Sequence, residues 1–323
     1  MTTDSTSDST TGSTAGTPGG HPDAEPTALL APSADASASL VSSVSSGSSG
    51  GPRAEIGVIG GSGLYDFLDD FDTVEVDTPF GRPSDPLVIG EVEGRPVAFV
   101  ARHGKGHRFP PHRVNYRANL WALRAVGVRQ VLAPCAVGSL RPDQGPGTVV
   151  VPDQVVDRTW GREHTVYDVE GPVVHVGFAD PYCPNGRQVA VDASRLAGFE
   201  VEPEGTLVVV NGPRFSSRAE SVWHQQAGWS IVGMTAMPEA ALARELAMCF
   251  TNIALVTDAD AGVEGGDAVT HEEVLRVFGT NVERLKSVLR DAIGQLPAHE
   301  ADDVATCACR RALDGLELPF PLP

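Results

Sequence analysis

Short apolar runs alternate with helical patterns along the chain from Ala54 onward. Five runs rich in aliphatic residues predict strands, at 56–59, 97–100, 130–133, 206–210 and 252–256. Their continuous apolarity indicates strands that are covered on both faces. Apolar residues at helical spacing predict helices between them, at 115–126, 188–196, 218–227, 238–248 and 271–293. This alternation predicts an α/β fold.

Two of these helices have recognisable N-termini. Ser217 is followed three residues later by Glu220, and Thr270 by Glu273, which is the spacing of a capping box. Pro238 suits the first position of its helix, where the missing N–H costs nothing. Ligands of α/β folds gather where strands end and loops begin, so we look for chemistry at those points.

The ends of the chain differ from its middle in composition. Residues 1–53 are rich in Ser, Thr, Gly, Asp, Pro and Ala without periodicity, which predicts a disordered tail. Residues 54–297 are long enough for one large core, and we predict a single domain there. Residues 298–323 are then a C-terminal extension, expected to be partly helical.

Composition excludes several classes of protein. A net charge of −18 repels polyanions and argues against nucleic acid as a partner. No apolar run approaches the roughly 20 residues of a membrane helix, and no signal peptide is recognisable, so we expect a cytoplasmic protein. The five cysteines lie at 135, 183, 249, 307 and 309. Their spacing is typical neither of a zinc knuckle nor of a disulfide framework, so we expect reduced thiols.

A glycine-rich turn follows the first predicted strand. Gly60-Gly61-Ser62-Gly63 lets backbone N–H groups and the Ser62 hydroxyl approach an anion. Two alternatives remain open from this motif alone. It resembles a dinucleotide-binding turn, with Asp77 as a candidate ribose acid, and a purely structural turn has the same composition.

A basic cluster follows the next strand. Arg102 and His103 bring a fixed bidentate cation and an imidazole donor to the same edge of the sheet, which suits an oxyanion. A basic surface loop is the plainer interpretation. A metal site formed by His103, His107 and His112 is a sharper alternative, although no Cys, Asp or Glu stands in this cluster.

Two later strand ends carry small residues or carboxylates. The loop 134–139 exposes the backbone of Cys135 and Ala136 to a ligand, while the Cys135 sulfur is better explained as buried filler. Asp258 and Asp260 close an apolar strand, where a carboxylate is costly unless it is paired or protonated. Without further context, an aspartate pair that caps a loop is the favoured interpretation.

Several motifs in order resemble the methylthioadenosine phosphorylase branch of the trimeric purine-nucleoside phosphorylases, over about residues 56–289. The motifs are Ile59-Gly60-Gly61-Ser62-Gly63-Leu64, residues 78–85, Ala101-Arg102-His103-Gly104, Val114-Asn115-Tyr116-Arg117-Ala118-Asn119, residues 212–221 and Met234-Thr235. The resemblance implies one α/β domain with a twisted mixed sheet flanked by helices. It also implies phosphorolysis of a 6-aminopurine nucleoside, 5′-methylthioadenosine first, to adenine and a ribose 1-phosphate.

The resemblance assigns roles to residues of this chain. Phosphate is expected at Ser62, Arg102, His103, Cys135, Ala136 and Thr235. The nucleoside is expected at Phe215, Ser216, Met234, Asp258, Asp260, His271, Val274 and Leu275. Asp258 is the expected catalytic residue, stabilising charge on the departing adenine. The resemblance further implies a homotrimer or a dimer of trimers, inorganic phosphate as co-substrate, and neither a metal nor another cofactor.

One residue departs from the pattern and keeps alternatives open. His271 stands where the animal methylthioadenosine enzymes have a small apolar residue, so adenosine or a 5′-halogenated adenosine is an alternative substrate. A helix-capping surface histidine is the plainer interpretation. A 6-oxopurine phosphorylase of the same fold, and an NAD-dependent oxidoreductase based on the glycine turn, complete the alternatives.

Overall fold

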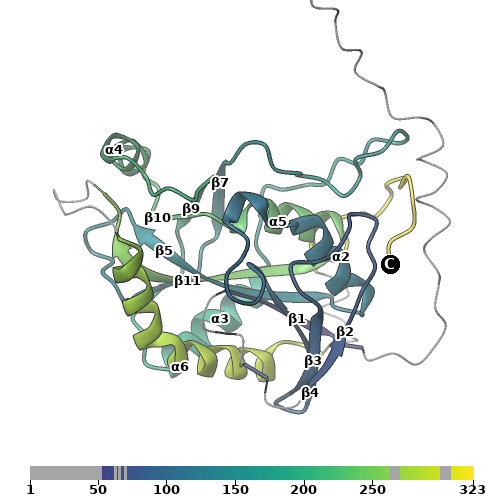
Figure 1. The fold of residues 1–323 in the computed structure, drawn as a ribbon, viewed down its shortest axis with the longest axis horizontal. Helices are drawn as coiled ribbons and strands as arrows, with labels where there is room; N and C mark the ends of the chain where they lie inside the picture. The colour runs from purple at the N-terminus through teal and green to yellow at the C-terminus, as the bar shows by residue number, and fades with distance from the viewer. Residues whose placement is uncertain (1–52, 62–63, 65–66, 69–70, 262–269, 299–306) are drawn as a thin grey trace, which may run out of the picture.

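The computed structural model describes residues 53–61, 64, 67–68, 71–261, 270–298 and 307–323. The predicted tail, apart from Arg53, and the candidate phosphate ligand Ser62 lie outside the described residues. The described part confirms an α/β fold in which helices flank a mixed, open sheet (Figure 1).

The centre of the sheet is parallel. β1 (Ile56–Gly60) pairs with β4 (Arg95–Ala101) on one side and β5 (Gln130–Ser139) on the other, and β5 also pairs with β11 (Cys249–Ala259). All of β1, and all of β11 except its last residue, is buried, as the continuous apolar runs predict. Parallel pairing brings the carboxyl ends of these strands to one edge of the sheet.

Antiparallel and short strands extend this centre. β3 (Leu87–Val92) lies antiparallel to both β2 (Phe71–Val74) and β4. On the opposite side, β10 (Ile231–Gly233) runs antiparallel to β5 and parallel to β9 (Thr206–Val210), which pairs with β7 (Gln154–Arg158). Two further short strands continue from β11, and they are β6 (Val149–Val150) and β8 (Val201–Glu202).

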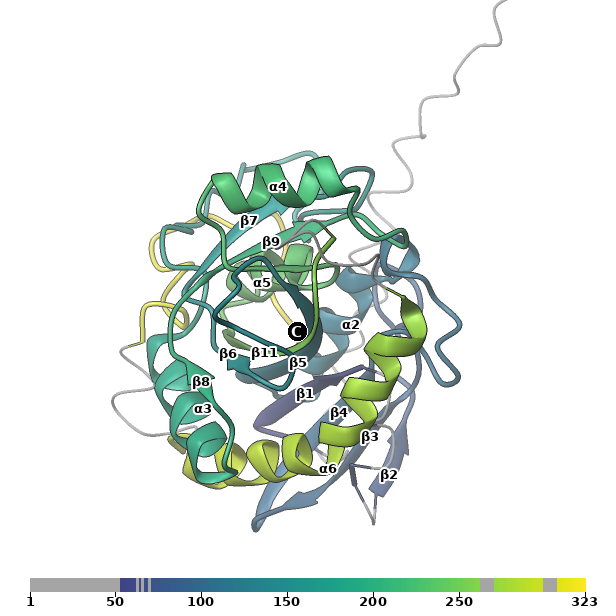
Figure 2. The same ribbon diagram turned by 90° about the vertical axis from the view of Figure 1, so that its left-hand side faces the viewer.

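Helices cover both faces of the sheet. α3 (Pro184–Leu196) packs against α6 (His271–Gln295), and both contact β11 from one face. α2 (Tyr116–Ala125) and α5 (Ala236–Glu245) pack together on the other face. α4 (Arg218–Gln226) lies on the opposite side of the molecule from α3 and α6 (Figures 1 and 2). None of the described helices combines the length and apolarity needed to cross a membrane.

The predicted helix starts are confirmed in part. Ser217 and Glu220 form a reciprocal capping box, and the Thr270 side chain accepts from the Glu273 N–H. Met237 has a non-helical backbone inside α5, so its regular turns begin at Pro238, as predicted. α3 begins four residues before the predicted 188, because Pro184 supplies a good first helical position that the apolar periodicity does not reveal.

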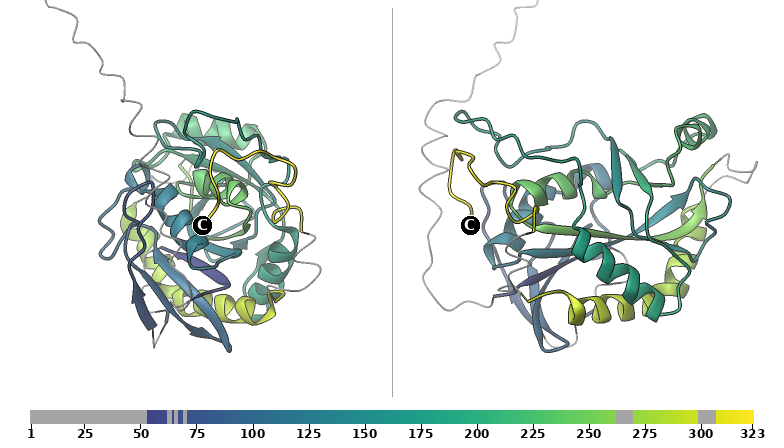
Figure 3. Two further views of the ribbon diagram at one scale, coloured as in Figure 1. Left: turned by 90° about the vertical axis from the view of Figure 1, so that its right-hand side faces the viewer. Right: turned by 180° about the vertical axis from the view of Figure 1, so that it is seen from behind.

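The C-terminal extension is described at residue 298 and from residue 307 onward. Residues 308–315 form turns and residues 316–323 are irregular, so no helix lies among residues 307–323. Phe320 instead packs against Trp121 and Tyr167, with ring centroids 5.8 and 5.4 Å apart. In the left view of Figure 3 this segment, in yellow, lies across the face of the domain that is turned toward the viewer. Packing of aromatic side chains, and not a helical pattern, fixes its course.

Candidate active site

A pocket of about 390 Å³ opens at the carboxyl ends of the parallel strands. It is lined by Gly61 after β1, by residues after β4, by the second half of β5 and by the end of β11. Every predicted site residue that the structure describes lines it, namely Arg102, His103, Cys135, Ala136, Phe215, Ser216, Met234, Thr235, Asp258, Asp260, His271, Val274 and Leu275. The volume falls within the range of small-molecule sites.

Arg102 is fixed by a buried carboxylate. Its Nε and Nη2 donate to the two oxygens of Glu239 at 2.6 and 3.1 Å, and its Nη1 donates to the Pro134 carbonyl at 3.1 Å. Both side chains of the ion pair are almost wholly buried. A guanidinium has five N–H groups, so two remain for a ligand. Nη1 also lies beside Gly61 of the glycine turn, 3.7 Å from where a Cβ would be.

His103 is a neutral residue in this site. Its Nδ1 lies 2.9 Å from the Phe109 carbonyl, which can only accept, so Nδ1 carries the proton. Burial, with a contribution from Arg102, lowers the pKa of His103 to about 3. In this neutral tautomer Nε2 is an acceptor, whereas the sequence analysis expects an imidazole donor. A neutral Nε2 suits a protonated oxygen of HPO₄²⁻.

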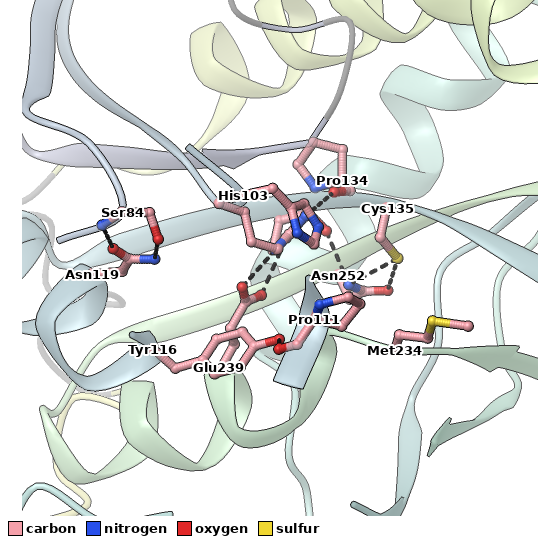
Figure 4. A network of polar contacts seen from close by, with 12 residues as sticks. Ser84, His103, Pro111, Tyr116, Asn119, Pro134, Cys135, Met234, Glu239 and Asn252 are labelled. Carbon is pink, nitrogen blue, oxygen red and sulfur yellow. Dashed lines mark hydrogen bonds and ion pairs between the residues drawn. The ribbon is translucent and has the colours of Figure 1, made fainter. Parts of the chain in front are cut away.

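Thr235 and residues of β5 also line the pocket. Thr235 is the N-cap residue of α5, but its side chain makes no capping bond, which leaves the hydroxyl for a ligand. The Cys135 sulfur lies 3.5 Å from the amide of Asn252 (Figure 4), and burial raises the pKa of this thiol to about 11. The thiol is thus a neutral buried group, as the sequence predicts.

Asp258 enters the pocket at an irregularity in β11. The pairing of β11 with β5 shifts register between Val256 and Asp258, and places Asp258 opposite Gly138. A Cβ on Gly138 would lie 2.9 Å from Asp258 Oδ1. Thr257 Oγ1 donates to Asp258 Oδ2 at 2.8 Å. Bulges re-aim side chains in this way, and here the bulge directs a carboxylate into the cavity.

The environment raises the pKa of both aspartates, so each holds its proton to a higher pH than usual. Burial raises the pKa of Asp258 to about 6, while the Thr257 hydrogen bond opposes the shift and the nearby Asp260 adds to it. Burial also raises the pKa of Asp260, whose carboxylate accepts from Ser221 Oγ. A carboxyl group that is half protonated near pH 6 can donate a proton to a ligand at neutral pH.

The remaining walls are mostly apolar. Phe215 and Met234 line one side, and Gly212 allows the Met234 sulfur to approach, since a Cβ there would lie 2.6 Å from Sδ. Val274 and Leu275 from the first turns of α6 also line the pocket, as does His271 before them. His271 therefore both begins α6 and lines the pocket.

Four residues that support the site were not predicted as site residues. Glu239, Thr257 and Gly138 lie directly against the predicted groups. In the sequence, Glu239 stands in the predicted helix 238–248, Thr257 directly precedes Asp258, and Gly138 lies in the loop 134–139. The fourth, Arg162, donates to the carbonyls of Asn211, Met234 and Met237 and so holds together the loops that carry Phe215 and Thr235. Nothing local in the sequence marks Arg162.

Two alternatives from the sequence lose support. Asp77, the candidate ribose acid, is exposed and does not line the pocket. The imidazole rings of His103 and His107 stack with their centroids 4.3 Å apart. Within the described part of the chain, however, these two and His112 do not form a group that could hold a metal ion.

Residues 55–294 match the phosphorylase superfamily. The chain is 61% identical over 278 residues to a purine nucleoside phosphorylase of Streptomyces coelicolor, covering 84% of this chain and 98% of the relative. It is 52% identical over 269 residues to an S-methyl-5′-thioadenosine phosphorylase of Mycobacterium tuberculosis, covering 83% of this chain and 97% of the relative.

Solved structures show the same likeness. A methylthioadenosine phosphorylase from an antarctic soil metagenomic library superposes with a TM-score of 0.77 at 38% identity, covering 84% of this chain and 94% of that one. The Schistosoma mansoni methylthioadenosine phosphorylase in complex with adenine superposes with a TM-score of 0.72 at 39% identity, covering 75% and 91%.

Proposed function

The chain belongs to the phosphorylase superfamily, and from this premise we propose that it cleaves a 6-aminopurine nucleoside with inorganic phosphate. One observation carries the proposal: a fixed guanidinium, Arg102, and a buried acid with a pKa near 6, Asp258, line the same pocket. The first group suits an oxyanion and the second suits a leaving base. Relatives named S-methyl-5′-thioadenosine phosphorylase, and solved structures of such enzymes with adenine, support the substrate class.

Phosphate binds at the Arg102 side of the pocket. The two guanidinium N–H groups not used by Glu239 and Pro134, the Thr235 hydroxyl and the backbone around Ala136 hold its oxygens. Ser62 belongs to the same proposal, although it lies outside the described residues. Because Glu239 fixes the guanidinium, phosphate is positioned before the reaction begins, which is the larger part of such catalysis.

The glycosidic bond breaks at the Asp258 side. A phosphate oxygen bonds to C1′ of the ribose as the bond from C1′ to N9 breaks, and the electron pair of that bond passes to the adenine ring. Protonated Asp258 donates its proton to N7, so adenine leaves as a neutral molecule. Asp260, held by Ser221, accepts from the exocyclic amino group. No metal or other cofactor takes part in this proposal.

The 5′ substituent faces the first turn of α6. Val274 and Leu275 suit a methylthio group, which makes 5′-methylthioadenosine the first substrate. His271 in the same wall supports adenosine or a 5′-halogenated adenosine as the second candidate, because an imidazole can bond to a 5′-hydroxyl. A 6-oxopurine nucleoside is the weaker candidate, since it has no amino group at C6 to donate to Asp260.

We also propose that the chain works as a trimer or a dimer of trimers. The α6 wall of the pocket supports this, because the Leu275 side chain is 47% exposed in the single chain and a neighbouring subunit would cover it. Trp160 is 73% exposed and offers a further apolar contact. Light scattering coupled to gel filtration measures the assembly, and a monomer at micromolar concentration would contradict it.

The substrate is tested with the purified chain and a panel of nucleosides. Methylthioadenosine, adenosine, 5′-chloroadenosine and inosine are incubated with and without phosphate, and the release of adenine or hypoxanthine is followed. We expect phosphate-dependent release of adenine, fastest from methylthioadenosine. Release only from inosine would refute the 6-aminopurine assignment, and no release from any nucleoside would refute phosphorolysis.

A further inference from the structure

Four cysteines from separate parts of the chain meet away from the pocket. Cys183 directly precedes α3, Cys249 is the first residue of β11, and Cys307 and Cys309 lie in the turns of the C-terminal segment. Their sulfur atoms all lie within 4.8 Å of one another, and all four side chains are buried. Cys307 Sγ is 3.8 Å from both Cys183 Sγ and Cys249 Sγ.

This spacing is that of a metal-thiolate site. A tetrahedral zinc ion with Zn–S bonds of about 2.3 Å holds its sulfur ligands about 3.8 Å apart. A disulfide would require about 2.05 Å between two of these atoms. We propose that Cys183, Cys249, Cys307 and Cys309 bind one Zn²⁺ ion in a closed tetrahedral site. Binding displaces the thiol protons, so that thiolates coordinate the metal.

Positive groups surround the cluster. Zn²⁺ with four thiolates has a net charge of −2, which is costly to bury without compensation. Arg244 Nη2 donates to Cys309 Sγ at 3.7 Å. Arg310 follows Cys309 directly, and all four sulfurs act electrostatically on its guanidinium. Cys183 is the N-cap residue of α3, so the positive end of that helix dipole also faces the cluster.

The proposed site is structural. Four protein ligands leave no open coordination position for a substrate, and none of the four cysteines lines the pocket. The ion would tie the C-terminal segment, whose Phe320 packs on Trp121 and Tyr167, to the start of β11. The sequence analysis predicts reduced thiols and no metal, because the ligands are spread over the chain in no recognisable zinc spacing. The inference does not depend on the proposed function.

Metal content tests the proposal directly. The full-length chain is purified without chelators, and its metals are measured by inductively coupled plasma mass spectrometry. We expect one zinc per chain, and X-ray absorption at the zinc edge should show four sulfur neighbours at about 2.3 Å. The proposal is overturned if the reduced protein holds no zinc and takes up none from ZnCl₂, if it holds iron, or if mass spectrometry under non-reducing conditions finds the four thiols paired as disulfides.

Matched variants locate the ion. Cys183→Ser and Cys309→Ser should each reduce the zinc content at least tenfold, whereas Cys135→Ser, which changes the buried cysteine outside the cluster, should keep one zinc per chain. If the cluster variants do not fold, titration of the unaltered protein with p-hydroxymercuribenzoate should release one zinc as four thiols react. Release without thiol modification, or loss of zinc from Cys135→Ser alone, would refute the assignment.

Removal of the metal separates stability from activity. We expect the chelated protein to unfold several degrees lower, while kcat at 25 °C stays within about twofold of the untreated value. Complete loss of kcat in chelated protein that remains folded would contradict a structural role.

Discussion

Asp258 Oδ1 occupies the space where a side chain on Gly138 would begin, since a Cβ on Gly138 would lie 2.9 Å from that oxygen. The two residues are paired across β11 and β5, directly after the register shift in β11. The absence of a side chain on one strand therefore lets the carboxylate of the other, the proposed proton donor, reach the pocket. The observed position of the carboxylate therefore requires a residue without a side chain at 138.

Gly138→Ala tests this relationship. The added methyl group must displace the Asp258 carboxylate, and a misplacement of about 1 Å at a reacting group can cost about 10²-fold in rate. We expect kcat/KM for the nucleoside to fall by about that factor, with the KM for phosphate little changed. Gly145→Ala is the matched control, because a Cβ there meets nothing within 4 Å. Equal kinetics for the two variants would contradict the argument.

Asp258→Asn removes the proton donor and keeps the shape of the side chain. General-acid catalysis contributes about 10²–10⁴-fold, so we expect kcat for adenine nucleosides to fall within that range. Steady-state release of adenine measures the effect, with Asp77→Asn, at an exposed site outside the pocket, as the control. Turnover within twofold of the unaltered enzyme would remove Asp258 from this role.

Stability distinguishes this loss from misfolding. Because burial raises the pKa of Asp258 to about 6, its ionised form destabilises the folded chain above that pH. The neutral amide of Asp258→Asn removes that cost, so the variant should melt no earlier than the parent at pH 8. The advantage should disappear below the ordinary pKa of aspartate, where the carboxyl group is protonated in both the folded and unfolded states.

The pH dependence of the reaction follows from the same group. If protonated Asp258 is the active form, kcat/KM should fall tenfold per pH unit above about pH 6. Thr257 Oγ1 donates to the carboxylate and stabilises its ionised form. Thr257→Val should therefore move this descending limb of the pH–rate profile to higher pH. His103, whose pKa is lowered to about 3, should contribute no limb near neutrality. A limb unchanged in Thr257→Val would assign it to another group.

Glu239→Gln tests how Arg102 is held. The variant leaves a buried guanidinium without its counter-charge, which typically costs about 3–5 kcal/mol. We expect a loss of stability of this order in urea unfolding, and a KM for phosphate raised more than the KM for nucleoside. Asp143→Asn breaks an equally bidentate but exposed pair with Arg141, and should change neither property appreciably. Parallel effects in both variants would rule out a specific role for Glu239.

The sequence predicts the central sheet and the pocket well, for a physical reason. The runs that become β1, β5 and β11 are buried on both faces, so they are continuously apolar. The chemistry of an α/β fold lies at strand ends, which a linear sequence shows directly. Arg102 and Asp258 could be singled out because each follows or closes such a run, whereas the role expected of Asp258 came from the family resemblance.

Contacts between distant parts of the chain could not be predicted in this way. The partner of Arg102 is 137 residues away, and Cys183 and Cys307 are 124 residues apart. The protonation of His103 depends on a carbonyl in the following loop and on burial, neither of which is visible in residue types. Such features are set by tertiary packing, so local patterns carry no record of them.

His271→Ala tests which 5′ substituent the pocket prefers. His271 lines the pocket at the start of α6, and it lies close enough to His107 to help lower the pKa of that imidazole. A lost hydrogen bond of about 1 kcal/mol corresponds to about fivefold, so kcat/KM for adenosine should fall by roughly that factor. Methylthioadenosine offers no hydroxyl there and should be cleaved as before. Glu272→Ala changes the next exposed residue of α6 outside the pocket and serves as the control. Equal losses for the two substrates would show that His271 shapes the helix start and does not select the substituent.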